Sequence, residues 1–187
     1  MKHFKFYLPF LFVNLFFSLN CIAQNITLEE MIGLRVKNLD YVESYLSQKS
    51  WEITKAQNED DENLQSVTFG YKVNAFDNEK AVSWIKFYPN SDDINNLNMI
   101  SIQISDKNIY NIYMNSVKRN NFVLNSTEII ENGIKKIYVK KNTQIILETG
   151  ITEGTYRKNT FYKFNITFYM PDSDIDVKPS KYKFNKS

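Results

Sequence analysis

Two stretches of the sequence run from a helical pattern of apolar residues directly into an aromatic residue that opens a strand pattern. In the first, residues 39–51, Leu39, Val42 and Leu46 recur at the three- and four-residue spacing of one helix face. The second, residues 109–122, repeats the order of apolar helix, basic tip and aromatic strand opener about seventy residues later. This repeated order constrains the fold because each copy predicts one helix that leads into a set of strands.

After each helix pattern, apolar and polar residues alternate at the two-residue period of a strand with one buried face. The clearest example lies near the end of the chain, where Tyr162, Phe164 and Ile166 alternate with Lys163 and Asn165. Further strand patterns occur at 67–73, 81–88, 100–104, 122–130, 134–140 and 143–151. Such alternation is typical of antiparallel sheets. The sequence therefore predicts an α+β fold, a two-layer domain with a mainly antiparallel sheet and helices on one face.

The domain is predicted to contain two tandem helix-plus-strands units of the order α-β-β-β(-β), related by a pseudo-twofold axis. The first unit spans residues 24–105 and the second spans residues 106–171. A chance resemblance between two α+β segments is the alternative. Residues 172–187 change from acidic to basic and are predicted to form a disordered tail.

Local signals predict where the helices begin and end. Thr27 and Glu30 have the spacing of a capping box. Gly33 is expected to interrupt the helix that starts there, and Asn38 and Asp106 are predicted to cap the next two helices. The apolar stripe of the last helix is expected to comprise Ile109, Ile112, Tyr113 and Val117.

Residues 1–23 have the features of a secretory signal peptide, with cleavage expected after Ala23 or the next residue. Two lysines precede the apolar run at 6–19, which is shorter than the roughly 20 apolar residues that span a bilayer. No transmembrane segment is therefore expected after cleavage. The predicted location is periplasmic or secreted, with lipidation of Cys21 as a minor alternative.

His3 is the only histidine in the sequence and Cys21 the only cysteine, and both lie in the predicted signal peptide. Disulfides, thiol nucleophiles, imidazole general bases and the usual zinc sites are thus excluded from the mature chain. We expect a protein that is not an enzyme and holds no cofactor. The open alternative is a carboxylate-dependent glycan hydrolase, which needs two facing carboxylates. Glu148 and Glu153 are the candidates, against their interpretation as ordinary surface charges.

The charge balance argues against a nucleic-acid partner. Loss of the two signal-peptide lysines reduces the formal net charge from +2 to zero, whereas phosphate binding relies on a basic excess. Asp172, Asp174 and Asp176 have the spacing that begins a calcium loop. Val177 and Lys183 replace the glycine and the glutamate that such a loop requires, so no metal site is predicted.

One strand pattern in the first unit is apolar on both faces. Either face can fill the core, and in one arrangement Ile85 and Phe87 do so. In that case Trp84 and Tyr88 lie on the opposite, open face of the sheet, beside Tyr169. Aromatic side chains there can hold a sugar, a peptide or a partner protein. Burial in the core, or cover by the N-terminal helix, is the competing interpretation.

Short segments of the first half carry a resemblance to a known group of proteins. They are Thr27-Leu28-Glu29-Glu30, Tyr45-Leu46, Lys49-Ser50-Trp51, Thr68-Phe69-Gly70-Tyr71-Lys72 and Ser83-Trp84-Ile85. Together with the end of the signal peptide and the Asn, Lys and Ile bias, they resemble small signal-peptide-bearing secreted or periplasmic proteins of Bacteroidota, a group with no assigned activity. The resemblance implies a location and a sequence type, and no enzymatic motif accompanies it.

The sequence thus predicts a non-catalytic extracytoplasmic binding protein whose open sheet face contacts another envelope or secreted protein. Trp84, Tyr88 and Tyr169 are the predicted contact residues. The glycan hydrolase and a purely structural envelope component are the alternatives. The oligomeric state is left open by the sequence.

Overall fold

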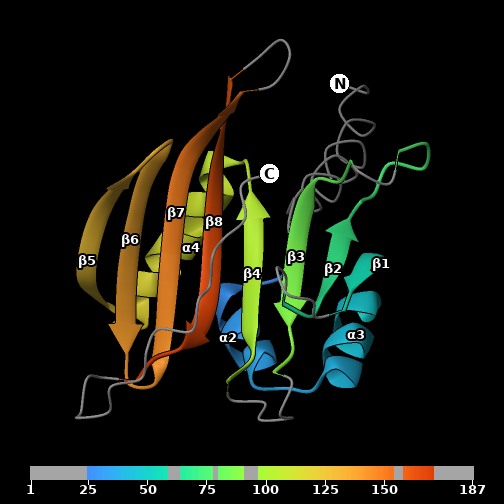
Figure 1. Ribbon diagram of the computed structural model, residues 1–187, viewed down its shortest axis with the longest axis horizontal. Coiled ribbons are helices and arrows are strands. Elements are labelled where there is room, and N and C mark those ends of the chain that lie inside the picture. The colour runs from blue at the N-terminus through green and yellow to red at the C-terminus, as the bar shows by residue number, and fades with distance from the viewer. Residues whose placement is uncertain (1–24, 59–63, 78–79, 91–96, 154–157, 171–187) are drawn as a thin grey trace, which may run out of the picture.

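The computed structural model describes residues 25–58, 64–77, 80–90, 97–153 and 158–170. These residues form three helices and one open antiparallel sheet of eight strands (Figure 1). The helices are α2 (Leu28–Arg35), α3 (Leu39–Gln48) and α4 (Lys107–Arg119). The strands are β1 (Trp51–Gln57), β2 (Ser66–Tyr71), β3 (Ser83–Tyr88), β4 (Met99–Ile104), β5 (Val123–Ile130), β6 (Gly133–Lys140), β7 (Thr143–Glu153) and β8 (Lys158–Phe168).

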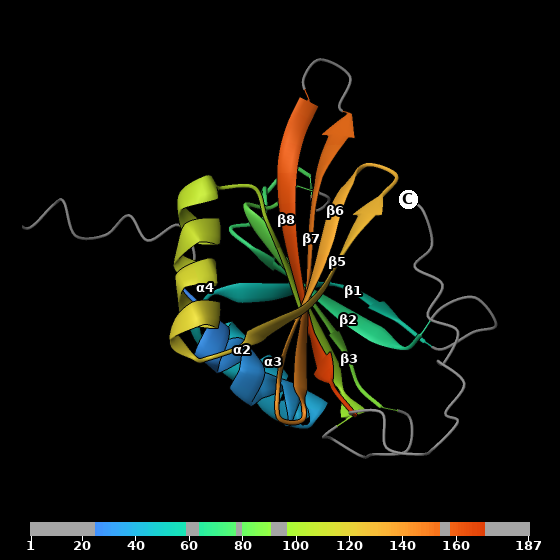
Figure 2. The ribbon, with the colours of Figure 1, turned by 90° about the vertical axis from the view of Figure 1, so that its left-hand side faces the viewer.

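The sheet has the strand order β1-β2-β3-β4-β8-β7-β6-β5, and every pair of neighbours is antiparallel. Strands β1 to β4 follow α3, strands β5 to β8 follow α4, and the two sets join along β4 and β8. Figure 2 shows that α2, α3 and α4 lie on one side of the sheet. The predicted α+β class, the antiparallel sheet and the placement of the helices are therefore confirmed.

The predicted signal peptide and the predicted tail at 172–187, with its three aspartates, lie outside the described residues. Within the described ranges, no helix has both the length and the apolar composition needed to cross a membrane.

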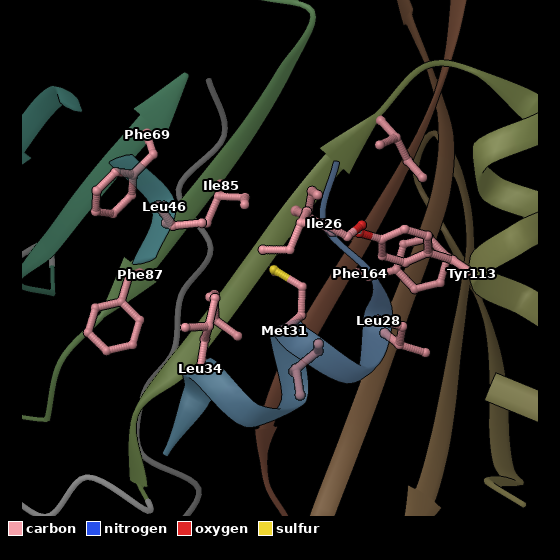
Figure 3. Close-up of a cluster of buried hydrophobic side chains, with 14 of the residues drawn as sticks. Ile26, Leu28, Met31, Leu34, Leu46, Phe69, Ile85, Phe87, Tyr113 and Phe164 are labelled. Carbon is pink, nitrogen blue, oxygen red and sulfur yellow. The ribbon is translucent and has the colours of Figure 1, made fainter. Parts of the chain in front are cut away.

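The core fills the space between the helices and one face of the sheet (Figure 3). Alternate strand residues point into it because the side chains of a strand alternate between its two faces. Ile85 and Phe87 of β3 are fully buried there, as are Val42 and Leu46 of α3. Phe164 of β8 packs against Tyr113 of α4, with ring centroids 5.1 Å apart.

Helix α2 begins at the predicted capping box. Thr27 Oγ1 accepts a hydrogen bond from the Glu30 backbone N–H, and the Glu30 carboxylate accepts one from the Thr27 N–H. The expectation that Gly33 interrupts the helix is wrong, because α2 continues through it to Arg35. Met31 and Leu34, on either side of the glycine, are buried in the core. Burial of two such side chains outweighs the roughly 1 kcal/mol that a glycine costs within a helix.

Two consecutive glutamates of α2 connect it to the ends of the other helices. Glu30 accepts hydrogen bonds from Tyr45 Oη at 2.6 Å and Lys49 Nζ at 2.9 Å, at the end of α3. Glu29 accepts hydrogen bonds at the end of α4 from Ser116 Oγ, Arg119 Nη2 and Asn120 Nδ2. Helix α2 therefore bridges α3 and α4.

The predicted stripe of α4 needs one correction. Ile109, Tyr113 and Val117 are buried as expected, whereas Ile112 is 59% exposed. The buried face is rotated towards Tyr110, whose ring stacks on that of Tyr162 at a centroid distance of 4.1 Å. The apolar spacing alone did not show whether Tyr110 or Ile112 faces the core. The ring that stacks on Tyr110 belongs to β8, which is distant in the sequence.

Candidate binding site on the open sheet face

The open face is the face of the sheet opposite the helices. Strand alternation and the antiparallel register assign residues to it, because their neighbours along each strand point into the core. Its central residues are Trp84, Lys86 and Tyr88 of β3, Ser101 and Gln103 of β4, Lys163, Asn165 and Thr167 of β8, and Ile146 and Glu148 of β7.

Trp84 is half-buried on the open face and lies against Gly70 of the neighbouring strand β2. A Cβ atom on Gly70 would lie 3.1 Å from Trp84 Cζ3 and 2.6 Å from Val73 Cγ2. The glycine thus leaves the room that the indole occupies. The structure places Trp84 outside the helix-covered core, against the competing interpretation of this residue.

Tyr88 is half-buried on the same face of β3, two positions beyond Lys86. Burial of the phenol, and secondarily the negative charge of Glu148, raise the pKa of Tyr88 to about 12. The two groups are close enough to interact although β4 and β8 separate their strands. The Lys86 ammonium lies 5.0 Å from the centroid of the Tyr88 ring, a cation–π contact.

Tyr169 follows the last residue of β8, and its backbone N–H donates a hydrogen bond to the Asn142 carbonyl at 2.9 Å. Within the described ranges, no ring contact joins it to Trp84 or Tyr88. The Cα atoms of Trp84 and Tyr88 are themselves about 13 Å apart at the rise of a strand. The three predicted contact residues therefore form no aromatic stack among the described ring contacts.

The sequence did not predict the burial of Asn165. This residue is only 1% exposed although it belongs to the open face. Asn165 Nδ2 donates a hydrogen bond to Glu148 Oε1 at 3.3 Å, while Oδ1 is buried and has no partner among the described residues. Alternation identified the correct face, but this burial depends on the order of the strands, which no local pattern specifies.

Lys86 lies on the open face near two other lysines. Burial of the ammonium, followed by the positive charges of Lys55 and Lys163, lowers the pKa of Lys86. No described carboxylate lies within ion-pair distance of its Nζ. The site therefore carries a half-buried cation that lacks an anionic partner in the described part of the chain.

The structure describes the side chain of only one of the two carboxylates predicted as candidates for glycan hydrolysis. Glu148 lies on the open face beside Asn165, whereas the side chain of Glu153 is outside what the structure describes. Among the residues that are described, no group of three acidic, histidine or cysteine side chains has the arrangement needed to hold a metal ion.

Comparisons with protein-family models, with curated proteins and with solved structures found no match to this chain.

Proposed function

We propose that this chain is a non-catalytic extracytoplasmic binding protein that contacts another envelope or secreted protein through the open face. One observation carries the proposal. The described helices all lie over one face of the sheet, and the opposite face presents Trp84, Lys86 and Tyr88 on β3. Aromatic side chains with a polar neighbour are the residues that most often anchor protein interfaces.

We infer further that the fold consists of two tandem units, and the backbone supports this in two ways. The four described non-glycine residues with positive φ fall on two pairs of corresponding positions. Ser50 and Asn121 lie between a helix and its first strand, at φ values of 63° and 58°. Lys72 and Lys141 follow the second strand of each unit, at 51° and 50°.

The outer strands provide the second support. β1 is irregular between Ile53 and Lys55, and β5 is irregular between Leu124 and Ser126, at corresponding places after the helix. The two glutamates of α2 bind at corresponding positions of the two proposed units. Glu30 binds Lys49, the C-cap of α3, and Glu29 binds Asn120, the C-cap of α4.

The correspondence locates the proposed pseudo-twofold axis. Tyr71 and Lys140 each precede a lysine with positive φ. Tyr71 pairs with Ser83 in the next strand, and Lys140 pairs with Thr143. The strand pairing continues from β3 into β4 in the first unit and from β7 into β8 in the second. Under the proposed correspondence, Ser101 of β4 is then the counterpart of Asn165 of β8. These two residues are also paired with each other. The axis therefore passes between Ser101 and Asn165, at the centre of the open face.

Site-specific photocrosslinking tests the proposed function. A photoreactive amino acid is introduced at Gln103, exposed on the open face, or at Ile112, exposed on α4, in cells that produce the protein. We expect one defined protein adduct from position 103 and none from position 112, with the partner identified by mass spectrometry. Equal adducts from both positions, or adducts from neither, would contradict binding through the open face and favour a structural component.

A further inference from the structure

We propose that the half of the open face formed by β5, β6, β7 and β8 packs against the same half of a second copy of this chain. The twofold axis of this dimer runs parallel to the strands and passes between β6 and β7, the two inner strands of the half-face. Strand β7 of one copy then lies over β6 of the other, and β8 lies over β5. The inference goes beyond the proposed function, and three properties of the half-face support it.

The first property is a row of alternating charge. One line of paired residues across the four strands comprises Lys163, Glu148, Lys135 and Glu128. The twofold rotation reverses the order of this row in the second copy. Glu148 of each copy therefore faces Lys135 of the other, and Lys163 faces Glu128. The half-face is thus complementary in charge to its own copy at all four positions.

The charges also select the direction of the axis. A twofold axis across the strands would place each strand over its own copy, so that Glu148 would face either Glu148 or a row without charges. Like charges that oppose each other across an interface weaken it. The axis parallel to the strands is the one that joins every charge of the row to an opposite charge.

The second property is an apolar centre that no described helix covers. Ile137 and Ile146 are paired on β6 and β7, beside the proposed axis, and both are only half-buried. Val139 is half-buried next to them, and Val123 of β5 is 65% exposed. The described helices all lie on the other side of the sheet (Figure 2). The rotation brings Ile146 of each copy over Ile137 of the other, which removes four isoleucine side chains from water.

The third property is size. The four strands are 8 to 11 residues long, so they form a surface of about 20 Å by 30 Å. The accessible surface of the side chains on such a face is comparable with the roughly 800 Å² that each partner buries in a stable interface. Two sheets that pack face to face align their strands to within about 30°, which keeps the inner strands β6 and β7 in register.

The dimer leaves the proposed partner contact uncovered. Strand β3 is separated from β8 by β4 and lies outside the half-face. Trp84 and Tyr88 therefore stay accessible in both copies. A dimer of this kind presents two copies of the contact surface on β3.

An exchange of charges between two variants tests the arrangement. Analytical ultracentrifugation of the purified protein should show a dimer. Glu148→Lys should weaken dimerisation by more than about tenfold, because it sets two lysines against each other at both symmetry-related pairs. Lys135→Glu should do the same with two glutamates. An equimolar mixture of the two variants should form dimers again, since each pair then joins a lysine to a glutamate.

Recovery on mixing distinguishes a lost contact from a lost fold, because mixing does not repair a misfolded chain. Glu43→Lys, at an exposed position of α3, is the matched control and should leave the dimer unchanged. A monomeric wild type would overturn the inference. So would a dimer that both variants leave intact, or variants that remain monomeric when mixed. None of these results bears on the proposed function, since the measurement contains no other protein.

Discussion

At the scale of single residues, the two tryptophans show how the same side chain is used in two ways. Trp51 opens β1 and is 1% exposed, and its Nε1–H donates to Asn25 Oδ1 at 3.0 Å. Trp84 lies on the open face over Gly70 and remains partly exposed. The first indole belongs to the core, whereas the second one lies outside the core and remains partly exposed.

This difference predicts opposite effects of two alanine substitutions. Trp51→Ala should lower the free energy of unfolding by about 3–5 kcal/mol, the cost of removing a buried aromatic side chain. Trp84→Ala should lower it less, by about 1 kcal/mol, because the indole lies outside the core and remains partly exposed. Urea denaturation measures both values. The Trp84→Ala protein should also lose the adduct formed from position 103, and a loss of stability as large as that of Trp51→Ala would place Trp84 in the core.

At the scale of secondary-structure elements, the sequence predicted what is local. The capping box at Thr27 and the N-caps Asn38 and Asp106 are present because each depends on atoms within three residues. The contact of Trp84 with Gly70 and the burial of Asn165 were not predictable, because both depend on which strands are neighbours. The same holds for Ile112, whose exposure follows from a ring on β8 that stacks on Tyr110.

The bridge formed by α2 predicts a loss of stability in acid. Burial alone would raise the pKa of Glu30, but hydrogen bonds from Tyr45, Lys49 and the Thr27 N–H outweigh it and lower the pKa to about 2. The carboxylate therefore stabilises the fold fully above its ordinary pKa of 4.5, and this contribution is lost as the pH falls towards 2. With solvent screening of a partly exposed group, the contribution is roughly 1–2 kcal/mol.

Glu30→Gln isolates this contribution. At pH 7 the variant should be less stable than the wild type in urea, and the two curves should converge between pH 4.5 and 2. The exposed Glu43 of α3 supplies the matched control, since Glu43→Gln should follow the wild type throughout. A difference between Glu30→Gln and the wild type that is constant with pH would mean that the ionised carboxylate does not provide the stabilisation.

At the scale of the whole molecule, the two proposed units share one sheet and one core. Ile102 and Phe164 pair across the seam between β4 and β8, and both are fully buried. The side chains at this seam belong to the same core as those of α3 and α4. Neither unit can therefore unfold at the seam and keep its own core packed. We therefore expect the two units to unfold together.

Coincident unfolding can be measured with one probe in each unit. Tryptophan fluorescence reports on the first unit, which contains both indoles, and hydrogen exchange of the β5 and β6 amides reports on the second. The two should give the same urea midpoint in the wild type. Phe164→Ala should lower the free energy of unfolding by about 3–5 kcal/mol. Both urea midpoints should therefore fall by the same amount. Separate midpoints would show that the units fold independently.

The irregular outer strands have a consequence for how the protein behaves at high concentration. An open sheet ends in two rows of unpaired backbone groups, and β5 also exposes Ile129, whose side chain is 92% accessible. Such rims are templates for edge-to-edge growth into fibrils. The bulge in β1 and the bulge in β5 interrupt the straight row of donors and acceptors that an incoming copy would need. The same bulges that support the proposed two-unit organisation thus make both edges of the sheet poorer templates for polymerisation.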